Sequence, residues 1–151
     1  MEYIYINKVA VRLIDDGRIE YPEPISSPSM AKEAVASYIK DFDREVFGVI
    51  SLNARGVPLN VNIVSMGSLS QTYVHPRETF KAAIVSNAAA IIAFHNHPSG
   101  KGYFSDEDLA AHKRLVEAGE IIGIKLIDSI VVAGGKGDIF SMACADEGLT
   151  P

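Results

Sequence analysis

Hydrophobic and polar positions along the chain follow two periods in turn, one typical of strands and one typical of helices. The run 88–94 is continuously apolar over the length of one buried strand and leads directly into two histidines. Residues 45–52 and 57–66 flank the turn signal Asn53-Ala-Arg-Gly56, which predicts a pair of strands. The predicted strands are 45–52, 57–66, 88–94, 121–127 and 129–133, and the predicted helices are 29–40, 75–87 and 105–118. The pattern therefore predicts a mixed α/β domain with a central sheet and flanking helices.

Residues 3–14 are rich in β-branched and aromatic side chains, which predicts a further strand. The turn signal Asp15-Asp16-Gly17-Arg18 follows this stretch and predicts a hairpin into residues 19–21. A strand at the edge of a sheet presents unpaired backbone groups. The 3–14 strand can therefore pair with a neighbouring molecule and build a homo-oligomer.

A loop rich in proline and serine at 22–28 is the internal boundary that the composition suggests. It lies too close to the start of the chain to separate two domains of ordinary size. We therefore predict an N-terminal extension of strand and loop over 1–28, followed by a single α/β domain over 29–151.

Charge and cysteine content exclude several classes of function. The chain carries 14 basic and 19 acidic residues, for a net charge of −5 and a pI near 5.3. No cluster of Lys and Arg offsets this balance, so charge does not support an association with DNA. The single cysteine, Cys144, excludes an intramolecular disulfide and a zinc site built from cysteines. We expect a soluble, cytoplasmic protein without a membrane partner, because the start Met1-Glu2-Tyr3-Ile4 does not resemble a signal peptide and no apolar run approaches the roughly 18 residues of a membrane span.

The segment from His95 to Asp108 carries the candidate chemistry. Side chains alternate across a strand, so His95 and His97 at the end of the apolar run point to the same side. A glycine-containing turn then leads to a helix with Ser105 at its N-cap, which places Asp108 in the first helical turn. Two imidazoles and one carboxylate, with a fourth position open to water, are the ligand set of a catalytic zinc site.

Each of these pieces also has a purely structural interpretation. The sequence Ser105-Asp-Glu-Asp108 has the form of a capping box, which needs no function beyond starting a helix. The two histidines can be ordinary buried residues whose ring nitrogens are hydrogen-bonded. Their combination with a buried strand and a glycine turn favours the metal site.

The same segment is similar to the JAMM motif of MPN-type zinc metalloproteases. His95-x-His97-Pro98 is followed, after six further residues, by Ser105-x-x-Asp108. Residues 45–141, about two-thirds of the chain, resemble the RadC-like JAB domain of bacteria. The shared stretches include Val74-His-Pro-Arg-Glu78 and His95-Asn-His-Pro-Ser-Gly100.

This resemblance implies a fold of cytidine-deaminase-like layering in which His95, His97 and Asp108 hold Zn²⁺. It also implies a glutamate on an earlier strand as general base, and Glu45 opens a predicted strand much as the family's glutamate does. Ser105 corresponds to the family's serine, which helps to stabilise the oxyanion. The implied enzyme is a metallopeptidase that hydrolyses a peptide or isopeptide bond, and the sequence does not identify the peptide or protein substrate.

Four residues in or near the candidate site have more than one interpretation. Glu45 can be an ordinary carboxylate at a strand edge, and Glu78 competes with it for the role of general base from a helix start. His112 lies on the same helical face as Asp108, so it is a partner of the site, a spare ligand or a solvent-facing histidine. His75 either lines the site or is a structural histidine at a helix start.

The chain departs from the family pattern at two places. Many RadC-like proteins carry Asp-His where this chain has Asp128-Ser129, so the contribution of that histidine is absent or comes from elsewhere. Lys101-Gly102-Tyr103-Phe104 replaces the family's usual acidic and proline residues, which changes the shape of the loop and the access of substrate.

Three rival functions follow from the same features. The first is a DNA-repair or mobile-element accessory protein that acts as a binding module, but residues 1–44 show no helix-hairpin-helix and the charge is acidic. A steep dependence of DNA affinity on salt would support that alternative. An HNH nuclease is excluded because its three residues are dispersed through a ββα unit, whereas 95–97 are adjacent. A catalytically inactive scaffold usually lacks the metal ligands that this chain retains.

Overall fold

The structure is a computed structural model that describes residues 3–21, 23–39, 42–67, 74–98, 103–134 and 138–146. Within these ranges five strands form one mixed sheet in the order β2-β1-β3-β4-β5. The strands are β1 (Val46–Leu52), β2 (Pro58–Met66), β3 (Ala90–His97), β4 (Lys125–Ala133) and β5 (Asp138–Ser141). The helices are α1 (Pro28–Ile39), α2 (Pro76–Thr79), α3 (Lys81–Val85), α4 (Asp106–Ile122) and α5 (Met142–Asp146). The predicted α/β fold with a central mixed sheet is confirmed.

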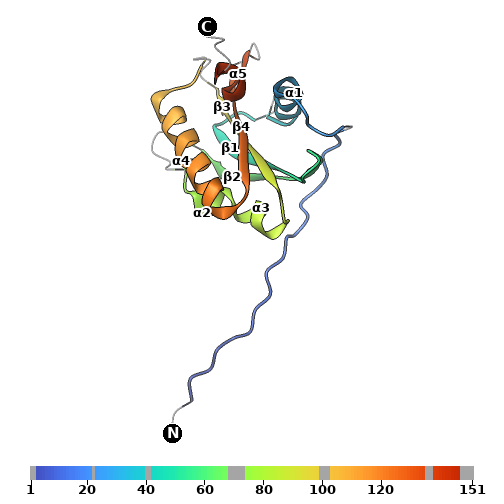
Figure 1. The fold of residues 1–151 in the computed structure, drawn as a ribbon, viewed down its shortest axis with the longest axis vertical. Coiled ribbons are helices and arrows are strands. Elements are labelled where there is room, and N and C mark those ends of the chain that lie inside the picture. The colour runs from blue at the N-terminus through green and yellow to red at the C-terminus, as the bar shows by residue number, and fades with distance from the viewer. Residues whose placement is uncertain are drawn as a thin grey trace.

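The sheet is antiparallel except at its centre. β1 pairs antiparallel with both β2 and β3, β3 pairs parallel with β4, and β4 pairs antiparallel with β5. Helix α1 covers one face of the sheet, and α4 covers the opposite face together with α2 and α3 (Figure 1). The strand β3, which carries both histidines, is therefore covered on both faces.

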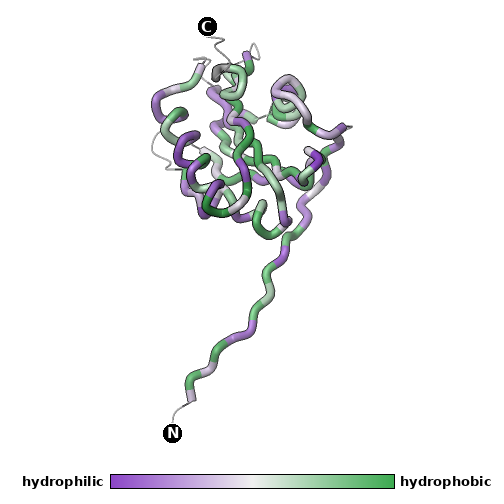
Figure 2. Tube along the Cα trace, in the orientation of Figure 1, coloured by the Kyte–Doolittle hydropathy of each residue, from purple (hydrophilic) through white to green (hydrophobic). Residues whose placement is uncertain are grey.

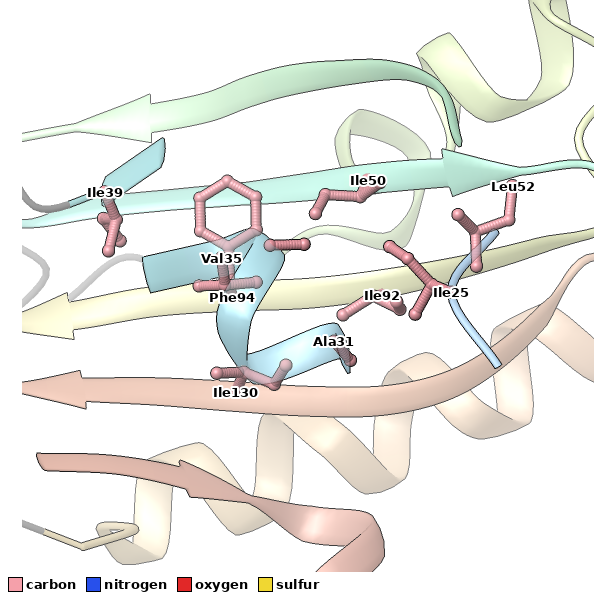
Figure 3. Packing of buried hydrophobic residues seen from close by; sticks show 10 residues of the cluster. Ile25, Ala31, Val35, Ile39, Ile50, Leu52, Ile92, Phe94 and Ile130 are labelled. Atoms are coloured by element: carbon pink, nitrogen blue, oxygen red, sulfur yellow. The ribbon is translucent and has the colours of Figure 1, made fainter. Parts of the chain in front are cut away.

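Two apolar layers hold the helices to the sheet. On the α1 side, the buried residues of the sheet and helix interdigitate, as Figure 3 shows for Ile25, Ala31, Val35, Ile39, Ile50, Leu52, Ile92, Phe94 and Ile130. The layer on the α4 side contains Phe47, Val49, Phe80, Ala83, Ala88, Ile91, Ala93, Leu115, Ile124 and Leu126. Alternate residues of β3 enter opposite layers, because successive side chains of a strand point to opposite faces.

The last helix before β4 is longer than the sequence pattern predicts. We predicted a helix over 105–118 that the following glycine, Gly119, ends. Helix α4 instead continues to Ile122 and ends at Gly123, which has the left-handed φ of 83° that favours glycine at this position. Gly119 serves a different purpose, since a Cβ there would lie 2.4 Å from the carbonyl oxygen of Ile124. Its missing side chain lets the helix end pack against the chain that follows. The two strands predicted at 121–127 and 129–133 are consequently one strand, β4.

The helix predicted over 75–87 is also divided. It forms the two short helices α2 and α3, separated at Phe80, whose side chain is fully buried. The strand predicted at 88–94 begins at Ala90 and extends through His97. Strand β5 and helix α5 were not predicted, because both are shorter than the windows in which hydrophobic periodicity is informative.

The strand and hairpin predicted at the N-terminus are wrong for this structure. Residues 3–21 form no strand or turn. Residues 3–20 run as an extended, exposed segment that leads away from the folded body, whereas Tyr21 is half-buried against the α1-side layer (Figure 1). The physical reason is the absence of a hydrogen-bonding partner, since no described strand of the same chain lies alongside them. No helix in the described ranges is both long enough and apolar enough to cross a membrane.

Candidate metal centre

His95, His97 and Asp108 converge on the α4 side of the sheet. The two histidines end strand β3, and Asp108 projects from the first turn of α4. The Nε2 atoms of the two rings are 2.7 Å apart, and Asp108 Oδ1 lies 2.9 Å from Nε2 of His95. Asp108 Oδ2 lies 3.5 Å from Nε2 of His97. Among the described residues this is the one group of His, Cys, Asp or Glu side chains that could hold a metal ion, with all three ligand atoms within 4.8 Å of one another.

The capping box predicted at the start of α4 is also present. The backbone N–H of Asp108 donates to Ser105 Oγ at 3.1 Å, and the backbone N–H of Ser105 donates to Asp108 Oδ2 at 2.7 Å. The cap holds one carboxylate oxygen of Asp108, while the other faces His95. The structural and the metal-binding interpretations are therefore compatible, because the cap fixes the carboxylate in the position that a ligand needs.

The electrostatics of Asp108 favour a carboxylate over a carboxylic acid. Burial on its own would raise the pKa of Asp108. The hydrogen bond and charge of His95, together with the hydrogen bonds from Ser105, outweigh burial and hold this pKa below its ordinary value. An ionised carboxylate is the form that binds a metal ion.

The donor set fits a divalent metal ion. An imidazole nitrogen without a proton is an acceptor, so two Nε2 atoms at 2.7 Å need either a proton or a cation between them. The carboxylate of Asp108 adds negative charge on the same side. Neutral imidazoles and a carboxylate are ligands that zinc accepts, and the three side chains leave a fourth position of a tetrahedron for water.

Glu45 lies at the same cleft, directly before strand β1. Phe47 pairs with His95 in the antiparallel β1–β3 ladder, so the register continued by two residues brings Glu45 opposite His97. Because side chains alternate, Glu45 and Phe47 share the face that carries the two histidines. Glu45 lines the cleft together with His95 and His97. The structure thus brings the predicted general base to the predicted metal ligands.

The backbone around Glu45 is held by Asn96, a residue whose role the sequence did not reveal. The Asn96 side chain is buried, its Oδ1 accepts from the N–H of Val46 at 2.7 Å, and its Nδ2 donates to the carbonyl of Arg44 at 2.9 Å. The carbonyl of Glu45 itself accepts from the N–H of Gly67 at 2.8 Å. One signal could have revealed Asn96, namely a polar residue between two histidines at a position that alternation assigns to the opposite, apolar face.

The cleft has a volume of about 800 Å³, which is large enough for several residues of a peptide. Its walls come from the start of β1, the ends of β2 and β3, helix α4, strand β4 and the segment before α4. The lining combines polar groups with apolar side chains. The lining includes Glu45, Phe47, Val74, His95, His97, Phe104, Ser105, Asp108, His112, Leu115 and Ser129.

Comparison with known proteins identifies the family of this domain. The family model described as the RadC-like JAB domain matches residues 25–149. The chain belongs to this family. A UPF0758 protein of Caldanaerobacter subterraneus subsp. tengcongensis is 42% identical over 113 residues, which are 75% of this chain and 48% of the relative. A UPF0758 protein of Desulforudis audaxviator is 44% identical over 117 residues, which are 78% of this chain and 51% of the relative. The chain thus spans about half the length of these curated relatives, and the resemblance that the motifs predicted is confirmed.

The structure separates the two glutamates that competed for one role in this RadC-like JAB domain. Glu78 is half-exposed and forms an ion pair with Lys81 at 2.6 Å, and it is not among the residues that line the cleft. His75 stands at the N-cap of α2, where its backbone carbonyl accepts from Thr79 Oγ1 at 3.0 Å. Val74 lines the cleft, whereas His75 is exposed and is not among the lining residues.

His112 lines the cleft and is not a solvent-facing histidine. It lies one turn after Asp108 on α4, it is half-buried, and its Nδ1 lies 2.7 Å from Oγ of Ser129 on β4. Both residues line the cleft. The RadC-like pattern commonly has Asp-His at 128–129, and here helix α4 supplies an imidazole beside Ser129.

Three aromatic residues, Tyr103, Phe104 and Phe140, form a cluster that the sequence did not predict. Tyr103 has a left-handed φ of 84°, and its ring centroid lies 5.1 Å from that of Phe104 and 5.2 Å from that of Phe140. Phe104 lines the cleft, so the RadC-like domain has an aromatic surface next to its candidate metal ligands. The predicted turn at 99–102 lies outside the described residues.

Proposed function

We propose that this RadC-like JAB domain is a zinc-dependent hydrolase of peptide or isopeptide bonds. The observation that carries the proposal is the convergence of His95, His97 and Asp108 in one cleft with Glu45. This arrangement offers three metal ligands and a carboxylate base, the two elements of metal-assisted amide hydrolysis. Imidazole and carboxylate ligands with a site for water suit zinc in particular.

The metal ligands have a defined task in this proposal. His95, His97 and Asp108 would hold a Zn²⁺ ion, whose chemistry would be to lower the pKa of a water towards about 7 and to polarise the amide carbonyl. Asp108 also keeps the start of α4 in place through its two hydrogen bonds with Ser105. Loss of its charge would therefore affect metal binding, whereas loss of the cap would affect the stability of the helix.

Glu45 and Ser105 would handle the proton and the developing charge. Glu45 accepts a proton from the attacking water and delivers it to the leaving nitrogen, so no net proton is gained or lost by the enzyme. Ser105 Oγ already accepts from the N–H of Asp108, which leaves the hydroxyl proton to donate to the oxyanion. Asn96 keeps the Glu45 backbone in register with the histidines.

The proposal is tested with a zinc-loaded chain and an unbiased peptide library, supplemented by peptides linked through a lysine side chain. Cleavage products are identified by mass spectrometry, and initial rates are compared for wild type, Glu45→Gln and Glu78→Gln. General acid–base catalysis contributes about 10²–10⁴-fold, so Glu45→Gln should lose at least about 100-fold in rate while it retains its zinc. Glu78→Gln, which removes an exposed glutamate of the same chain, should cleave at the wild-type rate.

Two outcomes would contradict the proposal. Zinc-loaded wild type that cleaves no member of either substrate set would refute amide hydrolysis as its activity. Equal rates for wild type and Glu45→Gln would refute the role of Glu45. Which set is cleaved decides between the peptide and the isopeptide bond.

A further inference from the structure

Residues 3–14, which we call the N-terminal arm, expose an unusual amount of apolar surface. The exposed fractions reach 93% for Ile4, 92% for Ile6 and 86% for Ile14. The large hydrophobic residues of the arm are Tyr3, Ile4, Tyr5, Ile6, Val9, Val11, Leu13 and Ile14, and all are exposed. Figure 2 shows the arm as a tube with many hydrophobic positions that extends away from the folded body. Contiguous apolar surface of this kind marks a site of interaction.

The arm has the two-faced pattern of a strand although it lacks a partner. Its odd-numbered positions from 3 to 13 are apolar except for Asn7. Its even-numbered positions combine the charged residues Lys8 and Arg12 with the apolar residues Ile4, Ile6, Ala10 and Ile14. Because successive side chains of an extended chain point to opposite faces, one face of the arm is apolar and the other is mixed.

Strand β2 presents a matching edge. It is an outer strand of nine residues, and its neighbour among the described strands is β1 on one side. Val61 and Ile63 point to the α1 side of the sheet and pack against its apolar layer. Asn60 and Asn62 alternate with them and occupy the opposite face. Val64 packs against the apolar layer on that opposite face. The edge therefore has one apolar face and one mixed face, as the arm does.

We propose that the N-terminal arm adds as a strand to the β2 edge of a second copy of this chain, and that the exchange is reciprocal. An added strand pairs with the outward-facing backbone groups of β2, which bond to no other described strand, and satisfies those of the arm at the same time. The apolar face of the arm continues the layer of Val61 and Ile63, and Lys8 and Arg12 lie on the face of Asn60. A strand shifted by one residue would reverse this match, so the pattern specifies which face of the arm lies on the side of Val61 and Ile63.

The root of the arm explains why the partner is a second copy. The N–H of Ile25 donates to the carbonyl of Gly56 at 2.8 Å, which ties the chain to the turn directly before β2. From this anchor the segment 3–20 leads away from its own sheet (Figure 1). Each copy thus offers one arm and one edge, and two copies exchange them in a closed symmetric dimer.

The first test measures the mass of the full chain in solution by light scattering during size-exclusion chromatography. Wild type should be a dimer, and Val11→Lys should raise the dissociation constant at least tenfold, because it places a charge on the apolar face. Ala10→Lys is the matched control, since it puts the same residue at the adjacent position on the face that already carries Lys8 and Arg12. It should remain dimeric. A monomeric wild type, or equal effects of the two lysines, would overturn the proposal.

The second test distinguishes exchange between copies from an arm that folds back on its own β2. In a Cys144→Ser background, a chain with Ala10→Cys is mixed with a differently tagged chain with Asn62→Cys and treated with a bismaleimide cross-linker, because the proposal places these two positions on the same face of the sheet. Both positions are central in their strands, so they stay close in either strand direction. Exchange predicts a cross-link between the two tagged chains. A third sample is a chain that carries both cysteines. A cross-link that forms only within single copies of that chain, and not between the two tagged chains, would overturn the proposal.

Discussion

The side-chain oxygen of Asn96 accepts a hydrogen bond from the backbone N–H of Val46 at 2.7 Å, and this contact joins the strand of the histidines to the chain segment of Glu45. The side-chain amide of Asn96 donates to the carbonyl of Arg44 on the other side of Glu45. A single buried amide therefore holds the residues on both sides of the proposed general base. His95 and His97 flank this amide in sequence and point to the opposite face of the sheet.

Replacement of Asn96 by alanine should reduce catalysis more than metal binding. The change leaves the backbone N–H of the buried Val46 without its partner, which costs about 1–3 kcal/mol, and it also removes the donor to the carbonyl of Arg44. We expect a lower free energy of unfolding and a lower kcat, with the zinc content of the folded protein unchanged. Denaturant titration, initial rates and metal analysis on one preparation check this expectation. Loss of stability with an unchanged kcat would show that Asn96 does not position Glu45.

Variants of Ser105 should separate its cap from its proposed hydroxyl donor. Ser105→Ala loses both and should cost about 1 kcal/mol of stability, a fall of about 2–4 °C in melting temperature for a domain of this size. Ser105→Thr keeps a hydroxyl that can cap and donate, so it should recover both stability and rate. Thermal unfolding and initial rates measure the two effects. If Ser105→Ala melts earlier but cleaves at the wild-type rate, Ser105 only caps the helix.

Asp128 should make the stability of the domain depend on pH. Burial raises the pKa of Asp128 above 3.8, although hydrogen bonds from the Ser141 hydroxyl and the Ala143 N–H oppose the shift. The folded state therefore holds the proton more tightly than the unfolded chain, so this residue's contribution to the free energy of unfolding falls as pH rises above 3.8.

The variant Asp128→Asn isolates this contribution because it cannot ionise. Urea titrations of both proteins from about pH 3 to pH 7 give the difference in unfolding free energy at each pH. We expect wild type to lose stability relative to Asp128→Asn as the pH rises. A constant difference over the whole range would contradict the raised pKa.

Gly119→Ala tests the close approach at the end of α4. In an unhindered helix this change stabilises by up to about 1 kcal/mol. Here the new Cβ would lie 2.4 Å from the backbone oxygen of Ile124, which cannot move independently of the strand that follows. We expect a destabilisation of about 1–3 kcal/mol, measured by denaturant unfolding. The sign of the change is decisive, since stabilisation would show that the helix end is not packed in this way.

The candidate ligands could be predicted from the sequence because their geometry is local. Alternation along one strand places His95 and His97 on one side, and a capping box places Asp108 in the first helical turn. The hydrogen-bonded pair of His112 and Ser129 could not be predicted in this way. It depends on how α4 packs across β4, and tertiary packing leaves no short-range pattern in the chain.

The errors of the sequence analysis have the same origin. Glycine usually ends a helix, which favoured an end at Gly119, but that glycine is needed for packing and Gly123 supplies the left-handed turn. Residues 3–14 have the composition of a strand, yet a strand needs a partner that the chain does not place beside them. In both cases the local residue preference indicated a structure, and contacts between residues far apart in the sequence determined which structure forms.

The most direct test of the central claim is the metal content of protein purified without chelator, measured by inductively coupled plasma mass spectrometry. Wild type, His97→Ala and Asp108→Asn are compared, because the amide oxygen of Asn can still accept from the N–H of Ser105 and so preserve the cap. We predict about one zinc per chain in wild type and loss of that zinc in both folded variants. Wild type without zinc after reconstitution, or full zinc in both variants, would contradict the account.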